Sequence, residues 1–95
     1  MTIYALSSGS GPSGIAVIRV SGKETAEVVK TLTESKLPTP RVATLKKFNK
    51  NGGKELIDEG VIIWFPGPNS YTGEDLAEFH VHGSRAVIKA MHLAI

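Results

Sequence analysis

The chain has 95 residues, which is the length of one small domain. Hydrophobic residues make up 41% of it and charged residues 21%, as in an ordinary folded protein. Its net charge of +2 is too small to predict nucleic-acid binding by itself. The absence of cysteine excludes disulfides, thiolate catalysis and cysteine-ligated zinc. No export signal is recognisable, and no apolar run reaches the roughly 18 residues that a membrane span needs, so we expect a cytoplasmic protein.

The pattern of apolar residues predicts alternating strands and helices. Runs of β-branched and aromatic residues favour strands, apolar spacings of three and four favour helices, and clusters of proline and glycine mark turns. In chain order, the expected elements are strands at residues 2–7 and 15–20, a helix at 22–34, strands at 41–48, 56–65 and 75–82, and a helix from 83 to 95. This ββαβββα order predicts an α+β fold, in which helices pack on a mixed or antiparallel sheet.

Three details refine this outline. Ser21 and Glu24 have the spacing of a capping box, which predicts that the first helix begins directly after Ser21. The run 61–65 is apolar on both faces of a strand, which predicts a central strand that is covered from both sides. The last helix reaches Ile95 without a stop signal, so residues 1–95 are expected to be a single domain that is truncated at its C-terminal end.

Two glycine motifs resemble nucleotide-binding loops. GSGPSG at residues 9–14 matches G-x-G-x-x-G, but a β-branched strand follows where a helix should open, and Pro12 removes one of the amides that would bind phosphate. The segment 21–24 lacks the upstream glycine and the metal-binding hydroxyl of a P-loop. We therefore expect a hairpin loop at 9–14, with a role in lining a ligand cleft left open, and no GTP binding by this chain.

Histidines and lysines offer further candidate sites. Glu78, His80 and His82 share one strand face and could ligate a metal, although side chains two apart on a strand converge poorly on one ion, so a solvated polar face is the favoured interpretation. A basic cluster flanks the predicted turn at 49–53 and is typical of a protected strand edge, with RNA contact as the alternative. It consists of Lys46, Lys47, Lys50 and Lys54.

Two single charges lie in otherwise apolar strands. Arg19 alternates with Ile18 and Val20, and Glu78 precedes Phe79. Each charge needs an ionic partner or access to solvent. The residue types alone favour a structural interpretation, in which both lie on the solvent face of the sheet and pair with each other.

A long, specific motif, PNSYTGED at residues 68–75, accompanies IAVIRVSG at 15–22, LIDEG at 56–60 and AEFHVHG at 77–83. Together these segments resemble the N-terminal domain of the tRNA modification GTPase family MnmE, also called TrmE. The resemblance covers essentially the whole chain in order. It implies a fold similar to the tetrahydrofolate-binding domain of glycine-cleavage T-protein-like enzymes.

The resemblance also implies function. Members of the family form homodimers through this domain and bind a tetrahydrofolate derivative, 5-formyl- or methylene-tetrahydrofolate, as a one-carbon donor. Their full-length chains add a helical domain and a GTP-binding domain, in which GTP, Mg and K would bind. With a flavin partner, MnmG, they modify carbon 5 of the wobble uridine of tRNA. Neither DNA nor a membrane is implied as a partner.

At residue level, the folate-contacting positions of the family correspond to Arg19 and Glu78, and a further lysine contact is expected beyond Ile95. The sequence departs from the family pattern at Ser13, where an arginine is common, and at Ser84, where a second glycine is common. Two other functions are kept as alternatives: an interaction domain with a vestigial folate site, and a strand-based metal protein that uses His80 with His82.

Overall fold

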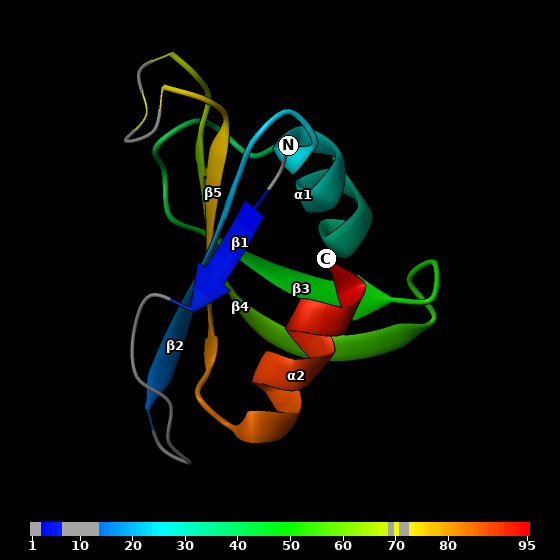
Figure 1. Ribbon diagram of the computed structural model, residues 1–95. Coiled ribbons are helices and arrows are strands. Elements are labelled where there is room, and N and C mark those ends of the chain that lie inside the picture. The colour runs from blue at the N-terminus through cyan, green and yellow to red at the C-terminus, as the bar shows by residue number, and fades with distance from the viewer. Residues whose placement is uncertain (1–2, 7–13, 69, 71–72) are drawn as a thin grey trace.

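The computed structural model describes residues 3–6, 14–68, 70 and 73–95. In chain order these residues form strands β1 (Ile3–Leu6) and β2 (Ile15–Ser21), helix α1 (Thr25–Thr33), strands β3 (Thr44–Lys50), β4 (Glu55–Phe65) and β5 (Leu76–His82), and helix α2 (Arg85–Ala94) (Figure 1). The predicted ββαβββα order is confirmed. The loop motif at 9–13 and positions 69, 71 and 72 of the PNSYTGED motif lie outside the described residues.

The strands form one five-stranded sheet in the order β1-β2-β5-β4-β3, and every neighbouring pair is antiparallel. Helix α1 carries the chain from β2 to the far edge at β3, and the chain then returns through β4 to β5, which lies between β4 and β2. The α+β prediction is confirmed, with a sheet that is antiparallel throughout. The expected N-terminal hairpin is also confirmed, because β1 pairs with β2.

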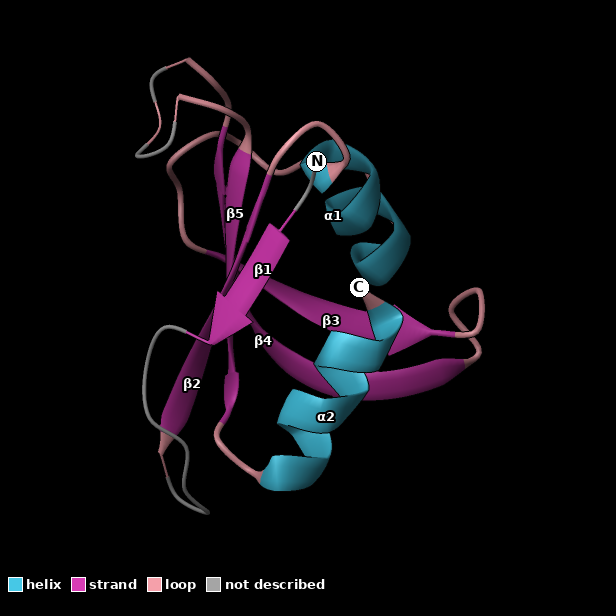
Figure 2. Cartoon of the chain, viewed as in Figure 1, coloured by secondary structure: helices cyan, strands magenta, loops and turns pink. Residues whose placement is uncertain are grey.

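The hydrophobic core lies between one face of the sheet and the two helices, which cover the same side (Figure 2). Alternate residues of β2 and β5 point into it because side chains alternate across a strand. Phe48 of β3 packs edge-to-face against Phe79 of β5, with ring centroids 5.3 Å apart. The buried apolar side chains of this cluster are Ala16, Ile18, Val20, Val29, Leu32, Phe48, Ile62, Trp64, Ala77, Phe79, Val81 and Met91.

We call the opposite side of the sheet the outer face. Within this chain the helices cover the apolar run 61–65 from one side only, because Ile62 and Trp64 are buried in the core while Val61, Ile63 and Phe65 face outward and are partly exposed. The run belongs to β4, which is internal to the sheet, and the central strand is β5. The outer face is where the charged residues of β2 and β5 lie.

The first helix begins later than the capping-box pattern predicts, and this prediction is wrong. Ser21 is the last residue of β2 and pairs with Leu76, so its side chain does not cap a helix. A turn follows, and α1 has Glu24 at its N-cap without any side-chain capping hydrogen bond. Pairing within the sheet has displaced a local helix signal.

Strand β4 approaches β5 so closely at Gly60 that a side chain is excluded there. A Cβ atom on Gly60 would lie 2.1 Å from the carbonyl oxygen of His80. The regular ladder between the two strands starts at the next residue, Val61. On the other side of Gly60, the Asp58 carboxylate accepts a hydrogen bond from the backbone N–H of His82 at 2.9 Å, so a side chain supplies the acceptor that the ladder lacks.

Candidate functional site on the outer face

The sheet register brings Arg19 and Glu78 together, although they are 59 positions apart in the chain. Arg19 of β2 pairs directly with Glu78 of β5, and Ile63 of β4 lies on the other side of Glu78. The Nε–H of Arg19 donates to Oε2 of Glu78 at 2.9 Å. The pairing that the residue types predicted is therefore confirmed.

A second donor reaches the same carboxylate from the same strand. Nε2 of His80 lies 3.1 Å from Oε1 of Glu78, so each carboxylate oxygen has one partner. The Glu78 side chain is only 12% exposed, whereas that of Arg19 is 46% exposed. Both residues lie on the face of the sheet that no helix covers, as the structural interpretation predicts, but Glu78 is buried there between its two partners.

The surroundings of Glu78 act on its acidity in opposite directions. Burial raises the pKa of this carboxyl, because desolvation penalises the charged form. The hydrogen bonds from His80 and Arg19, together with their positive charge, lower the pKa and outweigh burial, so the net pKa is below the ordinary value of 4.5. Glu78 is therefore ionised at neutral pH and can only accept hydrogen bonds.

This arrangement can recognise a polar ligand. An ionised carboxylate has about four lone-pair sites, and the two protein donors use one on each oxygen. The guanidinium beside it is half exposed and carries donors in a planar fork. A buried acceptor next to a half-exposed cation suits a ligand that presents N–H donors close to carbonyl or carboxylate groups.

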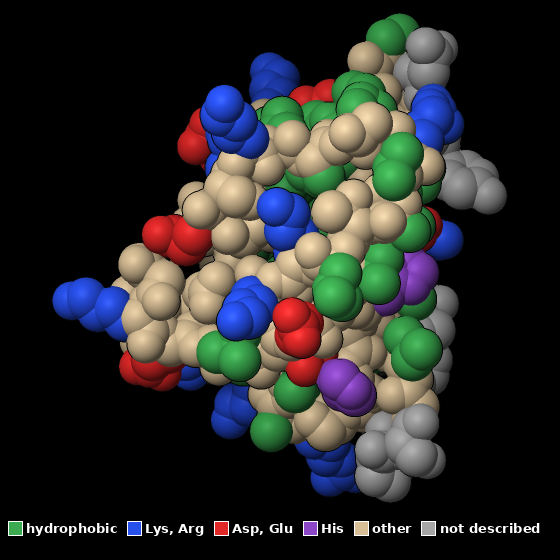
Figure 3. Space-filling view, turned by 180° about the vertical axis from the view of Figure 1, so that it is seen from behind, with side chains coloured by type: hydrophobic (Ala, Val, Ile, Leu, Met, Phe, Trp, Pro, Cys, Tyr) green, Lys and Arg blue, Asp and Glu red, His purple; other side chains and the backbone are tan. Residues whose placement is uncertain are grey.

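A shallow hollow of about 170 Å³ lies beside His80, one step along the sheet from Glu78. Its lining is largely apolar and comes from three strands, with Ile15 of β2, Val61 of β4 and the histidines of β5 among its walls. Seen from behind, histidine side chains lie beside hydrophobic side chains on the surface of the molecule (Figure 3). The hollow would accept a flat or apolar part of a ligand next to the polar centre.

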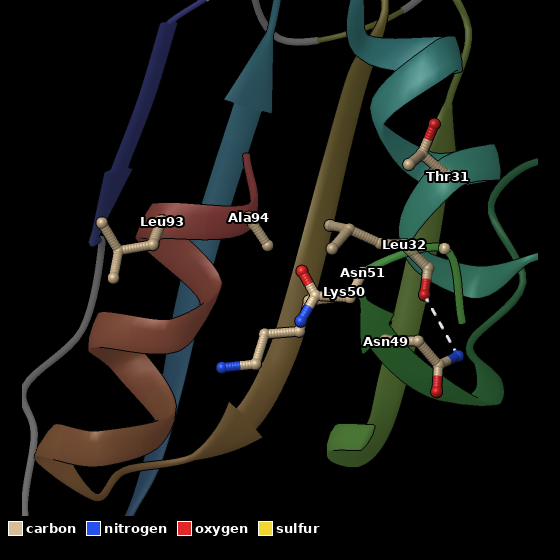
Figure 4. Close-up of a pocket in the computed structure, with 8 residues that line it drawn as sticks. Thr31, Leu32, Asn49, Lys50, Asn51, Leu93 and Ala94 are labelled. Carbon is tan, nitrogen blue, oxygen red and sulfur yellow. Dashed lines mark hydrogen bonds between the residues drawn. The ribbon is translucent and has the colours of Figure 1, made fainter. Parts of the chain in front are cut away.

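A second pocket, of about 260 Å³, lies on the helix side of the sheet. Figure 4 shows the residues that line it, with Thr31 and Leu32 on α1 and with Leu93 and Ala94 at the C-terminal end of α2. Asn49 lines its floor, and the side-chain amide of Asn49 donates to the backbone carbonyl of Leu32 at 3.4 Å. This amide ties α1 to β3, which is a structural role.

The candidate metal ligands do not meet at one point. His82 bonds Asp58 through Nδ1, at 2.9 Å from Oδ1, whereas His80 bonds Glu78. Across the described ranges, no group of three or more histidine, aspartate and glutamate side chains is arranged to hold a metal ion. Among the same residues, no helix has the length and the apolar character required to cross a lipid bilayer.

Sequence reasoning singled out Arg19 and Glu78 but missed two hydrogen-bond contacts of the outer face, between His80 and Glu78 and between His82 and Asp58. His80 as the second partner of Glu78 was detectable, because residues two apart share a strand face. Asp58 as the partner of His82 left no local signal, because the two residues are 24 positions apart and meet only through the pairing of β4 with β5.

The fold and the site define a small α+β domain with a buried, hydrogen-bonded carboxylate and a half-exposed guanidinium on one face of an antiparallel sheet. The chain belongs to the family described as GTP-binding protein TrmE N-terminus, which matches residues 2–95. The resemblance that the motifs indicated is thus confirmed.

Curated relatives agree with this assignment. The tRNA modification GTPase MnmE of Pelagibacter ubique is 67% identical over 95 residues, which is 100% of this chain and 21% of the relative. The mitochondrial 5-taurinomethyluridine tRNA synthase subunit GTPB3 of Danio rerio is 54% identical over 94 residues, 99% of this chain and 19% of the relative. MnmE of Maricaulis maris is 49% identical over 94 residues, 99% of this chain and 21% of the relative. The chain thus spans about a fifth of the length of these proteins.

Proposed function

We propose that this chain is the part of a cytoplasmic tRNA modification GTPase that binds a tetrahydrofolate one-carbon donor and pairs with a second copy of itself. The observation that carries the proposal is the buried Glu78 carboxylate beside the half-exposed Arg19 guanidinium on the outer face. The ligand class is proposed from the resemblance to the MnmE family, to whose N-terminal domain this chain belongs.

The chemistry of folates matches the two side chains. The pterin edge carries an amino group and a ring N–H side by side, and an ionised carboxylate accepts such a pair of donors. The guanidinium of Arg19 donates to ring carbonyls or to the carboxylates of the glutamate tail. The net lowering of the pKa of Glu78 supports this role, since the acceptor is ionised at neutral pH.

The activity of the whole protein is proposed from the relatives. Their printed names describe tRNA modification and GTP hydrolysis. We propose that the protein to which this domain contributes hydrolyses GTP with Mg and K bound outside these 95 residues, and that it acts with a flavin partner of the MnmG type. The tetrahydrofolate bound here supplies the one-carbon unit for carbon 5 of the wobble uridine.

The test is calorimetric titration of this chain with 5-formyltetrahydrofolate. Glu78→Gln replaces one acceptor oxygen by a donor and leaves a ligand donor unpaired, so we expect an affinity about ten- to a hundredfold lower. Glu27→Gln, which makes the same change on an exposed residue of α1, should leave the affinity unchanged. Both variants are titrated at a temperature at which circular dichroism shows them to be folded.

Two results would count against the proposal. An unchanged affinity in Glu78→Gln contradicts the role of Glu78 in ligand binding. If the wild-type chain itself shows no saturable binding, the alternative of an interaction domain with a vestigial site is favoured. Light scattering then shows whether two copies still pair without the ligand.

A further inference from the structure

We propose that His80 is a positioning residue for Glu78. Its ring N–H fixes the plane of the carboxylate to which the ligand donates its hydrogen bonds. This inference deepens the proposed function and rests on it for the identity of the ligand. Its structural content, a hydrogen bond that orients and polarises Glu78, can be measured without any ligand.

The first observation is the direction of the hydrogen bond. Nε2 of His80 lies 3.1 Å from Oε1 of Glu78. An ionised carboxylate has no proton to give, so the imidazole must donate, which requires the tautomer with hydrogen on Nε2 or the protonated ring. The contact therefore sets the state of the imidazole as well as the orientation of the carboxylate.

The second observation is how the two donors divide the carboxylate. Arg19 holds Oε2 and His80 holds Oε1, so the group is fixed at both oxygens and cannot turn about its terminal bond without losing one of them. With only the Arg19 contact left, the carboxylate could turn about its terminal carbon–carbon bond over a wider range of angles. A ligand with two donors side by side needs both carboxylate oxygens in the plane of those donors. A carboxylate that turns out of this plane bends both hydrogen bonds to the ligand and weakens them.

The third observation is the setting of the imidazole. Its cross-strand neighbours are Val17 on β2 and Val61 on β4, both apolar. Glu59 and His82 line the same hollow, and Glu78 is the group to which the ring bonds. The side chain of His80 is 30% exposed. Its partial burial between two valines restricts the ring and keeps it directed at Glu78.

His82 provides an internal comparison, because it lies on the same strand face two residues further on. Its ring bonds Asp58 and its side chain is 73% exposed. Of the two imidazoles on this strand face, His80 is thus the one that bonds Glu78. A change at His82 removes an imidazole from the same strand without removing a hydrogen bond to Glu78, so it serves as the control for the pKa of Glu78.

The experiment compares His80→Gln with His80→Asn. Glutamine places an amide N–H close to the position of Nε2 and can still reach Glu78, whereas asparagine is too short. The pKa of Glu78 is followed by carbon-13 NMR of its side-chain carboxyl, and affinity for 5-formyltetrahydrofolate is measured by calorimetry. We expect His80→Asn to raise the pKa of Glu78 and weaken binding about three- to tenfold, while His80→Gln keeps both near wild type.

The results separate the inference from the proposed function. An unchanged pKa of Glu78 in His80→Asn overturns the inference, and so does an equal rise in both His80 variants, because then the charge of the ring and not its hydrogen bond would be responsible. His82→Asn should leave the pKa of Glu78 as it is. If the wild-type chain binds no folate, the proposed function fails, and the NMR titration still decides the role of His80.

Discussion

At the scale of single residues, the outer face shows how two neighbours keep a buried acid charged. Desolvation alone would raise the pKa of Glu78 and favour a neutral carboxyl. The contacts from His80 and Arg19 reverse that effect, and both depend on the register of β5 against β2. The electrostatic state of the site is thus a property of strand pairing.

This state predicts a loss of stability in acid. Because the folded-state pKa of Glu78 lies below its unfolded value of about 4.5, the charged contacts stabilise the fold above that pH and are lost as the pH falls through the folded pKa. In Glu78→Gln this contribution is absent. Urea unfolding should therefore show that the free-energy advantage of wild type over Glu78→Gln shrinks between pH 6 and pH 3. A constant difference over that range would refute the assignment.

The close approach at Gly60 predicts a strong effect of one methyl group. In Gly60→Ala the new Cβ would lie 2.1 Å from the backbone oxygen of His80, so β4 or β5 must shift. We expect a loss of about 2 kcal/mol and a melting temperature lower by about 10 °C. Gly14→Ala is the control, because no atom of the described residues lies within 4 Å of the position that its methyl group would take. Equal melting temperatures in the two variants would contradict this account.

The residues of the candidate site were only partly predictable from the sequence. A charge inside an apolar strand is visible in the sequence, which is why Arg19 and Glu78 could be selected. The burial of Glu78 was not predictable, because it depends on which strands flank β5. Asp58 was not selected, since its partner His82 is 24 positions away in the chain and the regular pairing of β4 with β5 begins only at Val61. Long-range pairing determines what local patterns leave open.

At the scale of elements, the two helices begin in different ways. Helix α1 follows Glu24 without a side-chain cap, whereas α2 has Ser84 at its N-cap in an extended conformation, and the hydroxyl of Ser84 accepts from the N–H of Val87 at 3.2 Å. The resemblance to the MnmE family implies glycine where Ser84 stands. With φ of −74° this position does not require glycine, so the serine adds a cap without strain.

The cap predicts a graded response at Ser84. Ser84→Ala removes the acceptor and should cost about 1 kcal/mol, which lowers the melting temperature by about 4–8 °C. Ser84→Gly should cost only a few tenths of a kcal/mol, because an exposed backbone can bind water in place of the hydroxyl. Thermal unfolding followed by circular dichroism measures both. If alanine and glycine prove equivalent, the hydroxyl does not act as a cap.

Element order was predictable and element boundaries were less so. Periodicity gave all the strands and helices of the described residues in the right order. The start of α1 failed because Ser21, a good local cap, continues β2 and pairs with Leu76. A capping signal acts over one helical turn, and the competing strand pairing depends on residues far away in the chain.

At the scale of the whole molecule, the sheet is covered by helices on one side only. The outer face is mixed: it carries the Arg19–Glu78 pair beside apolar side chains, and Ile15 and Leu45 are each 66% exposed. Exposed apolar side chains around a polar group are typical of surfaces that become buried in protein–protein interfaces. This distribution supports the proposed pairing with a second copy.

Pairing through the outer face predicts a specific pattern of oligomeric states. Light scattering at a few hundred micromolar should give the mass of two chains for wild type. Leu45→Glu places a charge in the apolar part of the outer face and should yield monomers. Leu93→Glu, at an exposed position of α2 on the other side of the sheet, should remain dimeric. A wild-type monomer, or dissociation only in Leu93→Glu, would contradict pairing through this face.

The central place of β5 has a consequence for how the chain folds during synthesis. The β1–β2 pair and the β3–β4 pair can each form early, but they share no strand pairing, and β5 is the strand that bonds to both. Among the strands described here, it is also the last to leave the ribosome. Until residue 82 has emerged, the edge of β2 and the edge of β4 that will pair with β5 both remain open. Insertion of β5 then closes both edges at once. Assembly of the sheet and assembly of the site are therefore the same late event, since Glu78 and His80 arrive on that strand.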